Sequence, residues 1–268
     1  MFFFCFVWLL LPLPFVVSGF LSKGQHSTAA PSFHKRHPFV AFLSTQPHPP
    51  LTEREIKTIL DPIPIYAISS TQNDAILLVD DGNKNVGSFY LSKDHADDVA
   101  EQYSDVQVDA YSLGQVYFEL FEKSASPTAS ASPVKVISTN SKDNEYRLVA
   151  DPIQVDQAKV LLQQMPGVTE AAIKGFNEIP LFMDQRIRLV EGDDEEAEDY
   201  KEIFPIYFGW DDLMDTCEEY KKAYAQSGEK FEAAISVSDF FLVMNQMQEA
   251  SQVDFRNVAM IPATPKPY

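Results

Sequence analysis

Histidine and cysteine, the side chains that most often bind metals or act as nucleophiles, are few in this chain and gather at its N-terminus. Five of the seven lie within the first 48 positions: Cys5, His26, His34, His37 and His48. Beyond them only His95 and Cys217 remain, and a lone histidine and a lone thiol cannot build a zinc site or an internal disulfide. We therefore expect no metal or redox chemistry. His95 is predicted to be an exposed residue in the first turn of a helix, and Cys217 a small apolar helix residue.

The sequence also lacks the short motifs on which other enzyme classes depend. It contains no Gly-rich phosphate loop, no G-x-S-x-G, no H-E-x-x-H and no histidine placed as base for a Ser or Cys nucleophile. Neighbouring carboxylates such as Asp211 and Asp212 would point apart on a helix. The acidic run "EGDDEEAEDYKE" (191–202) lacks the donor spacing of a calcium loop and is interpreted as a solvated hairpin loop. We expect a protein that is not an enzyme and holds no cofactor.

Apolar side chains at helical spacing are the remaining candidates for a site, and they would bind an unfolded polypeptide. Met and aromatic side chains adapt to varied partners without a fixed hydrogen-bond pattern. They occur in "YSLGQVYFEL" and in "DFFLVMNQMQEA". The candidate client-binding residues are Val116, Tyr117, Leu120, Phe240, Phe241, Met244 and Met247. Such a stripe is more often part of a buried core, and that alternative stays open.

The elements that carry these stripes occur twice along the chain. "IPIYAIS" is followed by "AILLVDDG", "NVGSFYLSKDHADDVAEQY" and "VQVDAYSLGQVYFEL", and matching segments return in the same order: "IPLFMDQ", "RIRLVEGD", "EIFPIYFGWDDLMDTCEEY" and "FEAAISVSDFFLVMNQM". Such repetition indicates an internal duplication. We predict a mixed α+β fold with two pseudo-symmetric halves, 61–121 and 176–248, each with a small sheet and two helices.

Local signals place the ends of these elements. Ser92, Ser112 and Ser238 stand where a helix would need an N-cap. The tract "EKSASPTASASP" (122–133) is too poor in large side chains to bury anything and is interpreted as a flexible insertion. A connector (134–175) contains a strand, a turn at Asp151-Pro152 and a helix that ends before Pro166-Gly167, and it would join the halves. Residues 249–268 are assigned to a C-terminal tail.

The charge balance restricts the partners of the chain. Its 21 Lys and Arg face 39 Asp and Glu, and no acid precedes Glu53. Without residues 1–52, three basic residues are lost and the net charge becomes −21. A strongly acidic protein is an improbable nucleic-acid partner, whereas its field would attract basic, acid-poor polypeptides. Solubility alone is the simpler explanation of the same charge.

The first 52 residues have the composition of a targeting leader. Residues 1–19 are apolar, too short to span a membrane comfortably, and end in Val17-Ser18-Gly19, which predicts a signal peptide cleaved before Phe20. An uncleaved membrane anchor is the alternative. Residues 20–52 are rich in Ser, Thr and Pro and lack acids, as transit peptides do. The combination, with Phe20 at the junction, resembles the bipartite presequence of algae with complex red plastids.

The mature part, 53–268, resembles the twenty-two-kilodalton subunit family of the Tic translocon. The resemblance rests on "IPIYAIS", "VGSFYLSKDHADDVAEQY", "YSLGQVYFEL", "YRLVADPIQVDQA", "IPLFMDQ" and "PIYFGWDDLM", in that order. "YRLVADPIQVDQA" is similar to the family's R-F-x-P-D-P-x-Q-V region, with Ala150 where that pattern usually has Pro. The Ser/Ala/Pro insertion is a second departure from the family pattern.

The resemblance implies a duplicated α/β fold with apolar pockets and a chaperone-like role. It implies a soluble or peripherally attached protein of the plastid envelope intermembrane space. Its partners would be unfolded preproteins, transit peptides and envelope translocon subunits. The alternative is a periplasm-type chaperone or scaffold for outer-membrane protein or lipid biogenesis.

Overall fold

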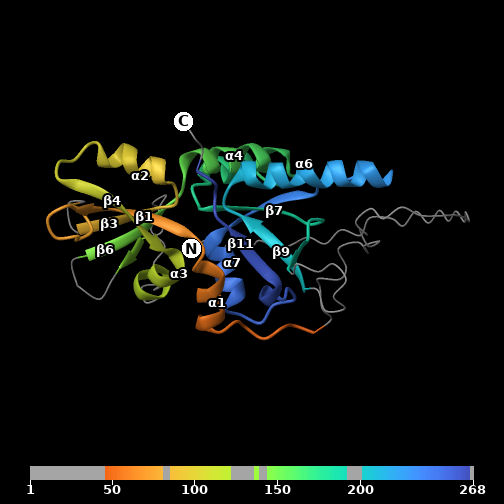
Figure 1. Cartoon of the computed structure of the whole chain (residues 1–268), viewed down its shortest axis with the longest axis horizontal. Helices are drawn as coiled ribbons and strands as arrows, with labels where there is room; N and C mark the ends of the chain where they lie inside the picture. Colours follow the sequence, from red (N-terminus) through yellow and green to blue (C-terminus); the bar gives the residue numbers. More distant parts are fainter. Residues whose placement is uncertain (1–45, 81–84, 122–135, 139–143, 192–200, 266–268) are drawn as a thin grey trace, which may run out of the picture. The chain divides into compact units, whose positions relative to one another are not determined.

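The computed structural model describes residues 46–80, 85–121, 136–138, 144–191 and 201–265. All of these belong to one compact unit, His37–Tyr268, drawn in colour in Figure 1. The predicted signal peptide, Phe20, nearly all of the predicted transit peptide, the insertion 122–133 and most of the acidic run lie outside the described residues. What the sequence predicts for those segments stays a prediction.

The first half builds a six-stranded sheet in the order β4-β1-β3-β6-β5, with β2 paired to β3. Strand β1 pairs antiparallel with both β3 and β4, whereas β3 and β6 run parallel. The strands are β1 (Pro64–Ser70), β2 (Leu78–Asp80), β3 (Asn85–Tyr90), β4 (Val106–Ser112), β5 (Val136–Ser138) and β6 (Asn144–Val149). The predicted connector strand is therefore part of the first sheet.

The second half builds a five-stranded sheet in the order β10-β7-β9-β11, with β8 paired to β9. Here β7 pairs antiparallel with β9 and β10, and β9 and β11 run parallel. The strands are β7 (Pro180–Asp184), β8 (Leu189–Glu191), β9 (Lys201–Tyr207), β10 (Ile235–Asp239) and β11 (Val258–Ile261). Element for element, this repeats the pairing of β1, β3, β4 and β6 in the first sheet.

The two halves thus share one order of elements. Three strands are followed by a helix, an edge strand and a last helix, as β1–β3, α2, β4 and α3 in the first half and as β7–β9, α6, β10 and α7 in the second. This confirms the mixed α+β class and the two sheets of similar make-up that the repeated segments predict. It also agrees with the predicted duplication. Common origin of the halves stays an interpretation, because similar topology does not by itself establish descent.

Helices cover both sheets (Figure 1). They are α1 (Glu53–Leu60), α2 (Lys93–Ala100), α3 (Leu113–Val116), α4 (Pro152–Gln164), α5 (Glu170–Gly175), α6 (Trp210–Ser227) and α7 (Phe240–Met247). A π-helical turn, η2 (Tyr117–Phe121), continues α3, and a 3-10 turn, η4 (Phe255–Asn257), precedes β11. Among the described segments, no helix combines the length and the apolar character needed to cross a bilayer.

Three apolar clusters hold these layers together. Ala96 of α2 packs with Ile68 and Tyr90 on one face of the first sheet. On the second sheet, Ala158 of α4 and Leu213 of α6 pack with residues such as Phe182. The largest cluster combines helices α1, α3 and α7 with η2 and side chains from both sheets. This largest cluster, called the shared core below, joins the two halves.

The candidate client-binding residues lie in this shared core, so their burial supports the core alternative that the sequence left open. Six are at most 8% exposed: Val116, Tyr117, Phe240, Phe241, Met244 and Met247. Leu120 is partly buried against the same cluster. Tyr117 meets Phe240 edge to face, with ring centroids 5.9 Å apart, so the stripes of the two halves pack on each other. The two matching stripes face one another because α3, η2 and α7 meet between the sheets. Since these side chains are buried, we do not propose them as a binding surface.

The helix caps match the sequence signals except at one position. Ser92 and Ser112 accept hydrogen bonds from the backbone N–H groups of His95 and Gln115, as predicted for N-caps. Ser238 instead lies within β10. Asp239 is the N-cap of α7, and its two carboxylate oxygens accept from two backbone N–H groups. The β-strand therefore runs one residue further than the sequence indicated.

The fold begins before the boundary predicted at residue 53. His48 forms an antiparallel bridge with Ser251, and Leu51 is 7% exposed in the shared core. Thr52 caps α1 in a capping box with Glu55. The backbone N–H and hydroxyl of Thr52, followed by Arg256, lower the pKa of Glu55. Where a leader would be cut stays a prediction, but Leu51 and Thr52 already belong to the packed unit.

The fold also includes most of the segment assigned to a tail. β11 is a paired strand of the second sheet, and Phe255, Val258 and Met260 are buried in the shared core. Arg256 donates to Glu55 across 3.0 Å and so connects this end of the unit to α1. The apolar run in "FRNVAMIP" is compatible with a strand, but it is short and has no local turn signal that separates it from a tail.

Candidate binding groove

A groove lies where the strand-to-helix links of the two halves meet. It is a hollow with a volume of about 270 Å³. Leu91 and Ser92 follow β3 on one side, and Phe208 follows β9 on the other. These two links occupy equivalent places in the repeated segments "FYLSKDH" and "IYFGWDD". The N-terminus of α4 and residues 262–265 complete the walls.

Gln154 holds the N-termini of α4 and α6 together at this groove. Its side-chain oxygen accepts from the backbone N–H of Trp210 at 2.8 Å. The N-cap residue of α6, Gly209, has no side chain to accept such a bond, so Gln154 takes that role from another helix. Gln154 is only 9% exposed, which makes the pairing necessary.

The segment after β11 is fixed along the same edge. The backbone N–H of Phe208 donates to the carbonyl of Ile261 at 2.9 Å, and that of Thr264 donates to Asp212 at 3.1 Å. Gly209 lies in the crowded corner between them. A Cβ there would lie 2.0 Å from the Asp212 carboxylate and 3.2 Å from the Cα of Ala263. The close approach of chain segments explains why this position is glycine.

The lining combines apolar side chains with carboxylates. Tyr66, Leu91 and Ile153 supply aliphatic and aromatic surface, and Ile153 is 55% exposed. Ile63 and Phe208 also line the groove but are only 1% and 4% exposed. The acidic residues of the lining are Asp94, Asp98 and Asp151. Lys93 lies at the same rim, but its ammonium contacts Asp97 at 2.6 Å, and that hydrogen bond raises the pKa of Lys93. The groove therefore suits a chain segment with apolar and cationic side chains.

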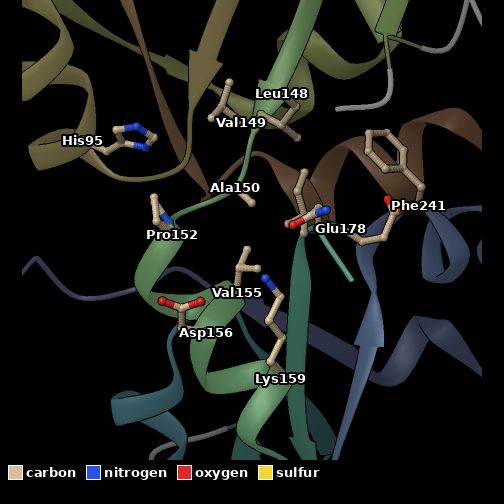
Figure 2. A pocket seen from close by; sticks show the side chains of 12 residues that line it. His95, Leu148, Val149, Ala150, Pro152, Val155, Asp156, Lys159, Glu178 and Phe241 are labelled. Carbon is tan, nitrogen blue, oxygen red and sulfur yellow. The ribbon is translucent and has the colours of Figure 1, made fainter. Parts of the chain in front are cut away.

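A second hollow, of about 280 Å³, adjoins the first and shares His95 and Pro152 with it. Figure 2 shows Val155, Asp156 and Lys159 of α4 along one side, with Leu148 and Val149 of β6 beyond them. Phe241, alone among the candidate client-binding residues, lines this hollow, although it is only 8% exposed.

His95 is partly buried between the two hollows, which corrects the prediction of an exposed residue. It does lie in the first turn of α2. Its ring meets Tyr90 edge to face at 5.1 Å between centroids. Nδ1 is buried, with no hydrogen-bond partner among the described residues. The residues around His95 in "SKDHADD" are polar, which predicts exposure. The contact of His95 with Tyr90 of β3 cannot be read from these neighbours.

Within the ranges that the structure describes, no three His, Cys, Asp or Glu side chains are grouped to hold a metal ion. Cys217 is fully buried in the cluster between α6 and the second sheet. Burial, and next the charge of Asp184, raises the pKa of its thiol to about 11, which makes it a poor nucleophile. Cys217 is thus the small apolar helix residue that the sequence predicts.

The sequence did not single out the groove residues, although signals for them existed. The Asp-Pro turn before α4 and the two matching links after β3 and β9 were all visible. Their meeting in one place was not, because it depends on how the halves pack. Loops at the ends of neighbouring strands commonly carry binding sites, and this rule was the signal that could have indicated the groove residues.

Comparison with known sequences identifies the family. The sequence profile of the Tic22-like family matches residues 27–266. The chain belongs to the Tic22-like family. No curated protein sequence matches it closely enough to count as a relative. The resemblance inferred from the sequence motifs is therefore confirmed at the level of the family.

Solved structures of Tic22 proteins share the fold. The structure titled "Anabaena Tic22 (protein transport)" is 18% identical, with a TM-score of 0.58, covering 81% of this chain and 100% of that one. "Tic22 from Plasmodium falciparum" is 15% identical, also with a TM-score of 0.58, covering 78% of this chain and 91% of that one. At such identities the likeness establishes the Tic22 fold and leaves function to the site.

Proposed function

We propose that this member of the Tic22-like family takes part in protein import into a plastid by holding preproteins in extended form between the envelope translocons. The groove at the junction of the two halves carries the proposal. Family membership and the protein-transport title of the Anabaena structure support it. The proposed place of action is the envelope intermembrane space, with soluble or peripheral attachment.

The chemistry of the groove fits preproteins in transit. Transit peptides are basic and acid-poor, and an unfolded segment exposes apolar side chains. The groove offers the apolar side chains of Tyr66, Leu91 and Ile153, and the carboxylates of Asp94 and Asp98. Binding would require neither metal nor cofactor. Acidic side chains at the rim also disfavour anionic lipid head groups, so a preprotein fits better than the alternative lipid cargo.

Binding of a basic peptide tests this proposal. A fluorescein-labelled peptide with the sequence of residues 20–45, which has three Lys or Arg and no acid, serves as the probe. We expect its fluorescence anisotropy to rise with protein concentration and the affinity to fall as salt increases. A version with the basic residues replaced by Glu should bind much more weakly.

Two exposed side chains on α4 provide a matched pair of variants. Ile153 lines the groove and is 55% exposed, whereas Val160, two turns later, is 51% exposed and lies outside it. Replacing either by Ser should change the free energy of unfolding by no more than about 0.5 kcal/mol. We expect Ile153→Ser to weaken peptide binding by about three- to tenfold, and Val160→Ser to leave it unchanged. Equal affinity of the two variants would refute the groove as the binding site.

A further inference from the structure

Strand β4 is a long, open edge of the first sheet. Its seven residues pair along their whole length with β1. On its other side, no strand of the described segments pairs with it. None of the groove-lining residues belongs to β4, so this edge is a separate feature of the molecule.

The register shows which backbone groups face outward. Leu113 donates to Ile63, and Thr71 donates to Asp105, so the hydrogen-bonded pairs fall on odd-numbered residues of β4. The N–H and C=O groups of Val106, Val108 and Ala110 consequently point away from β1. In the described part of the chain these groups make no hydrogen bond. They form a ladder of free donors and acceptors about 7 Å apart, the spacing that an added strand requires.

The other edge strands of the two sheets are shorter than β4. β2, β5 and β8 have three residues each, and β11 has four. Short edges resist pairing with foreign chains, and so do edges that carry Lys or Pro. β10, the equivalent of β4, has five residues, and its last, Asp239, uses its side chain to cap α7. β4 has seven residues and neither Lys nor Pro.

The charge around β4 selects the partner. Between positions 94 and 121 the chain has seven acidic residues and no Lys or Arg. Pairing of two β4 strands from two copies, centred on Asp109, would bring like charges together in an already acidic protein. A cationic segment meets the opposite field, and an extended one can complete the hydrogen bonds.

We propose that β4 binds an extended, cationic polypeptide segment as an additional strand of the first sheet. Backbone hydrogen bonds from Val106, Val108 and Ala110 would hold it without a fixed sequence requirement. This mode suits clients of varied sequence, and it stands or falls independently of the groove.

A proline substitution tests the proposal. Val108→Pro removes an outward N–H that makes no bond within the described structure, and Val108→Thr retains that N–H. The probe is a labelled nine-residue peptide of alternating Lys and Val, with an alternating Glu and Val peptide as the charge control. In the full-length chain we expect Val108→Pro to weaken binding of the Lys peptide by about tenfold, and Val108→Thr to bind like the wild type. Equal binding by Val108→Pro would overturn the proposal.

Hydrogen exchange of the unmodified protein gives a second reading that does not depend on the fold of the proline variant. We expect the peptide to slow exchange of the Val106, Val108 and Ala110 amides, whereas the Gln107 and Asp109 amides, already bonded to β1, should change little. Binding that leaves the first three amides unprotected would place the peptide elsewhere and overturn the proposal. A Lys peptide that binds β4 but is insensitive to Ile153→Ser would separate this edge from the groove.

Discussion

Cys217 shows how burial decides what a reactive side chain can do. The thiol is fully buried, and burial together with the nearby Asp184 raises its pKa to about 11. In the unfolded chain the thiol would titrate near its ordinary value, about 8.5. A thiol of this kind belongs to the packing of α6 and offers little to chemistry at neutral pH.

The raised pKa predicts both slow thiol reactivity and a loss of stability in alkali. The unfolded chain releases the thiol proton above about pH 8.5, whereas the folded chain keeps it until about pH 11. The contribution of Cys217 to the free energy of unfolding is therefore complete below about pH 8.5 and is lost as the pH rises from about 8.5 to about 11. In a Cys5→Ser background, Ellman's reagent should react slowly with the native protein and rapidly after denaturation.

The matched variant for this prediction is Cys217→Ala, which removes the titrating group. Its free energy of unfolding should fall less steeply with rising pH than that of the Cys5→Ser parent, measured by urea denaturation. Native thiol reactivity as fast as that of the denatured chain would show that Cys217 is accessible and that the account of its burial is wrong.

At the scale of elements, Gln154 is the clearest connection between α4 and α6. Replacing it by Ala leaves the partly buried N–H of Trp210 without this acceptor, at a cost of about 1–2 kcal/mol. We expect Gln154→Ala to lower the melting temperature by several degrees. Gln163→Ala, at an exposed position of the same helix, should change it little.

Two further readouts separate this effect from a general loss of helix stability. Amide exchange should speed up in the first turn of α6 in Gln154→Ala, while the middle of α4 keeps its protection. Unchanged melting in Gln154→Ala would mean that water or another group replaces the side chain and that α6 does not depend on it.

The elements with strong local signals were predictable from sequence. Ser92, Ser112 and the Asp151-Pro152 turn have side chains or rings that define a helix start by themselves, and all three do so in the structure. Ser238 and Asp239 compete for the same role. The aspartate takes the cap because pairing with β7 extends β10 through Asp239.

Elements held by distant partners were not predictable in the same way. β11 becomes a strand through pairing with β9, more than fifty residues earlier in the chain, and α1 is held through Leu51, Glu55 and Arg256. The groove depends on the same long-range packing. Local propensity does not contain information about contacts between distant segments. The groove was therefore not predicted, and residues 249–268 were predicted to be a tail.

At the scale of the whole molecule, packing between the halves decides which apolar residues are available. Periodicity identified Phe240 and Met244 correctly as members of a helix stripe, and both are fully buried. It could not say whether the stripe faced solvent or the other half. The meeting of two similar halves buries the stripes and leaves the groove, with Ile153 exposed, at their junction.

The composition of the leader predicts its route. Residues 1–52 fused to a fluorescent protein should carry it to a complex plastid, because a predicted apolar signal peptide precedes a predicted transit peptide that has no acid and begins at Phe20. Replacing Phe20 by Ala should hold the reporter outside the innermost compartments while entry into the endomembrane system continues. Deleting residues 1–19 should leave the reporter in the cytosol. Wild-type localisation of the Phe20 variant would remove that residue from the targeting signal.

The central claim is that the groove holds preproteins in transit, and site-specific crosslinking during import tests it most directly. A photoreactive amino acid is placed at position 153 in the groove, or at position 160 on the same helix outside it, both being exposed in the wild type. With a precursor arrested between the envelope membranes, we predict a covalent adduct from position 153 and little or none from position 160. Adducts of equal yield from both positions, or none from position 153 while the precursor is held there, would contradict the account.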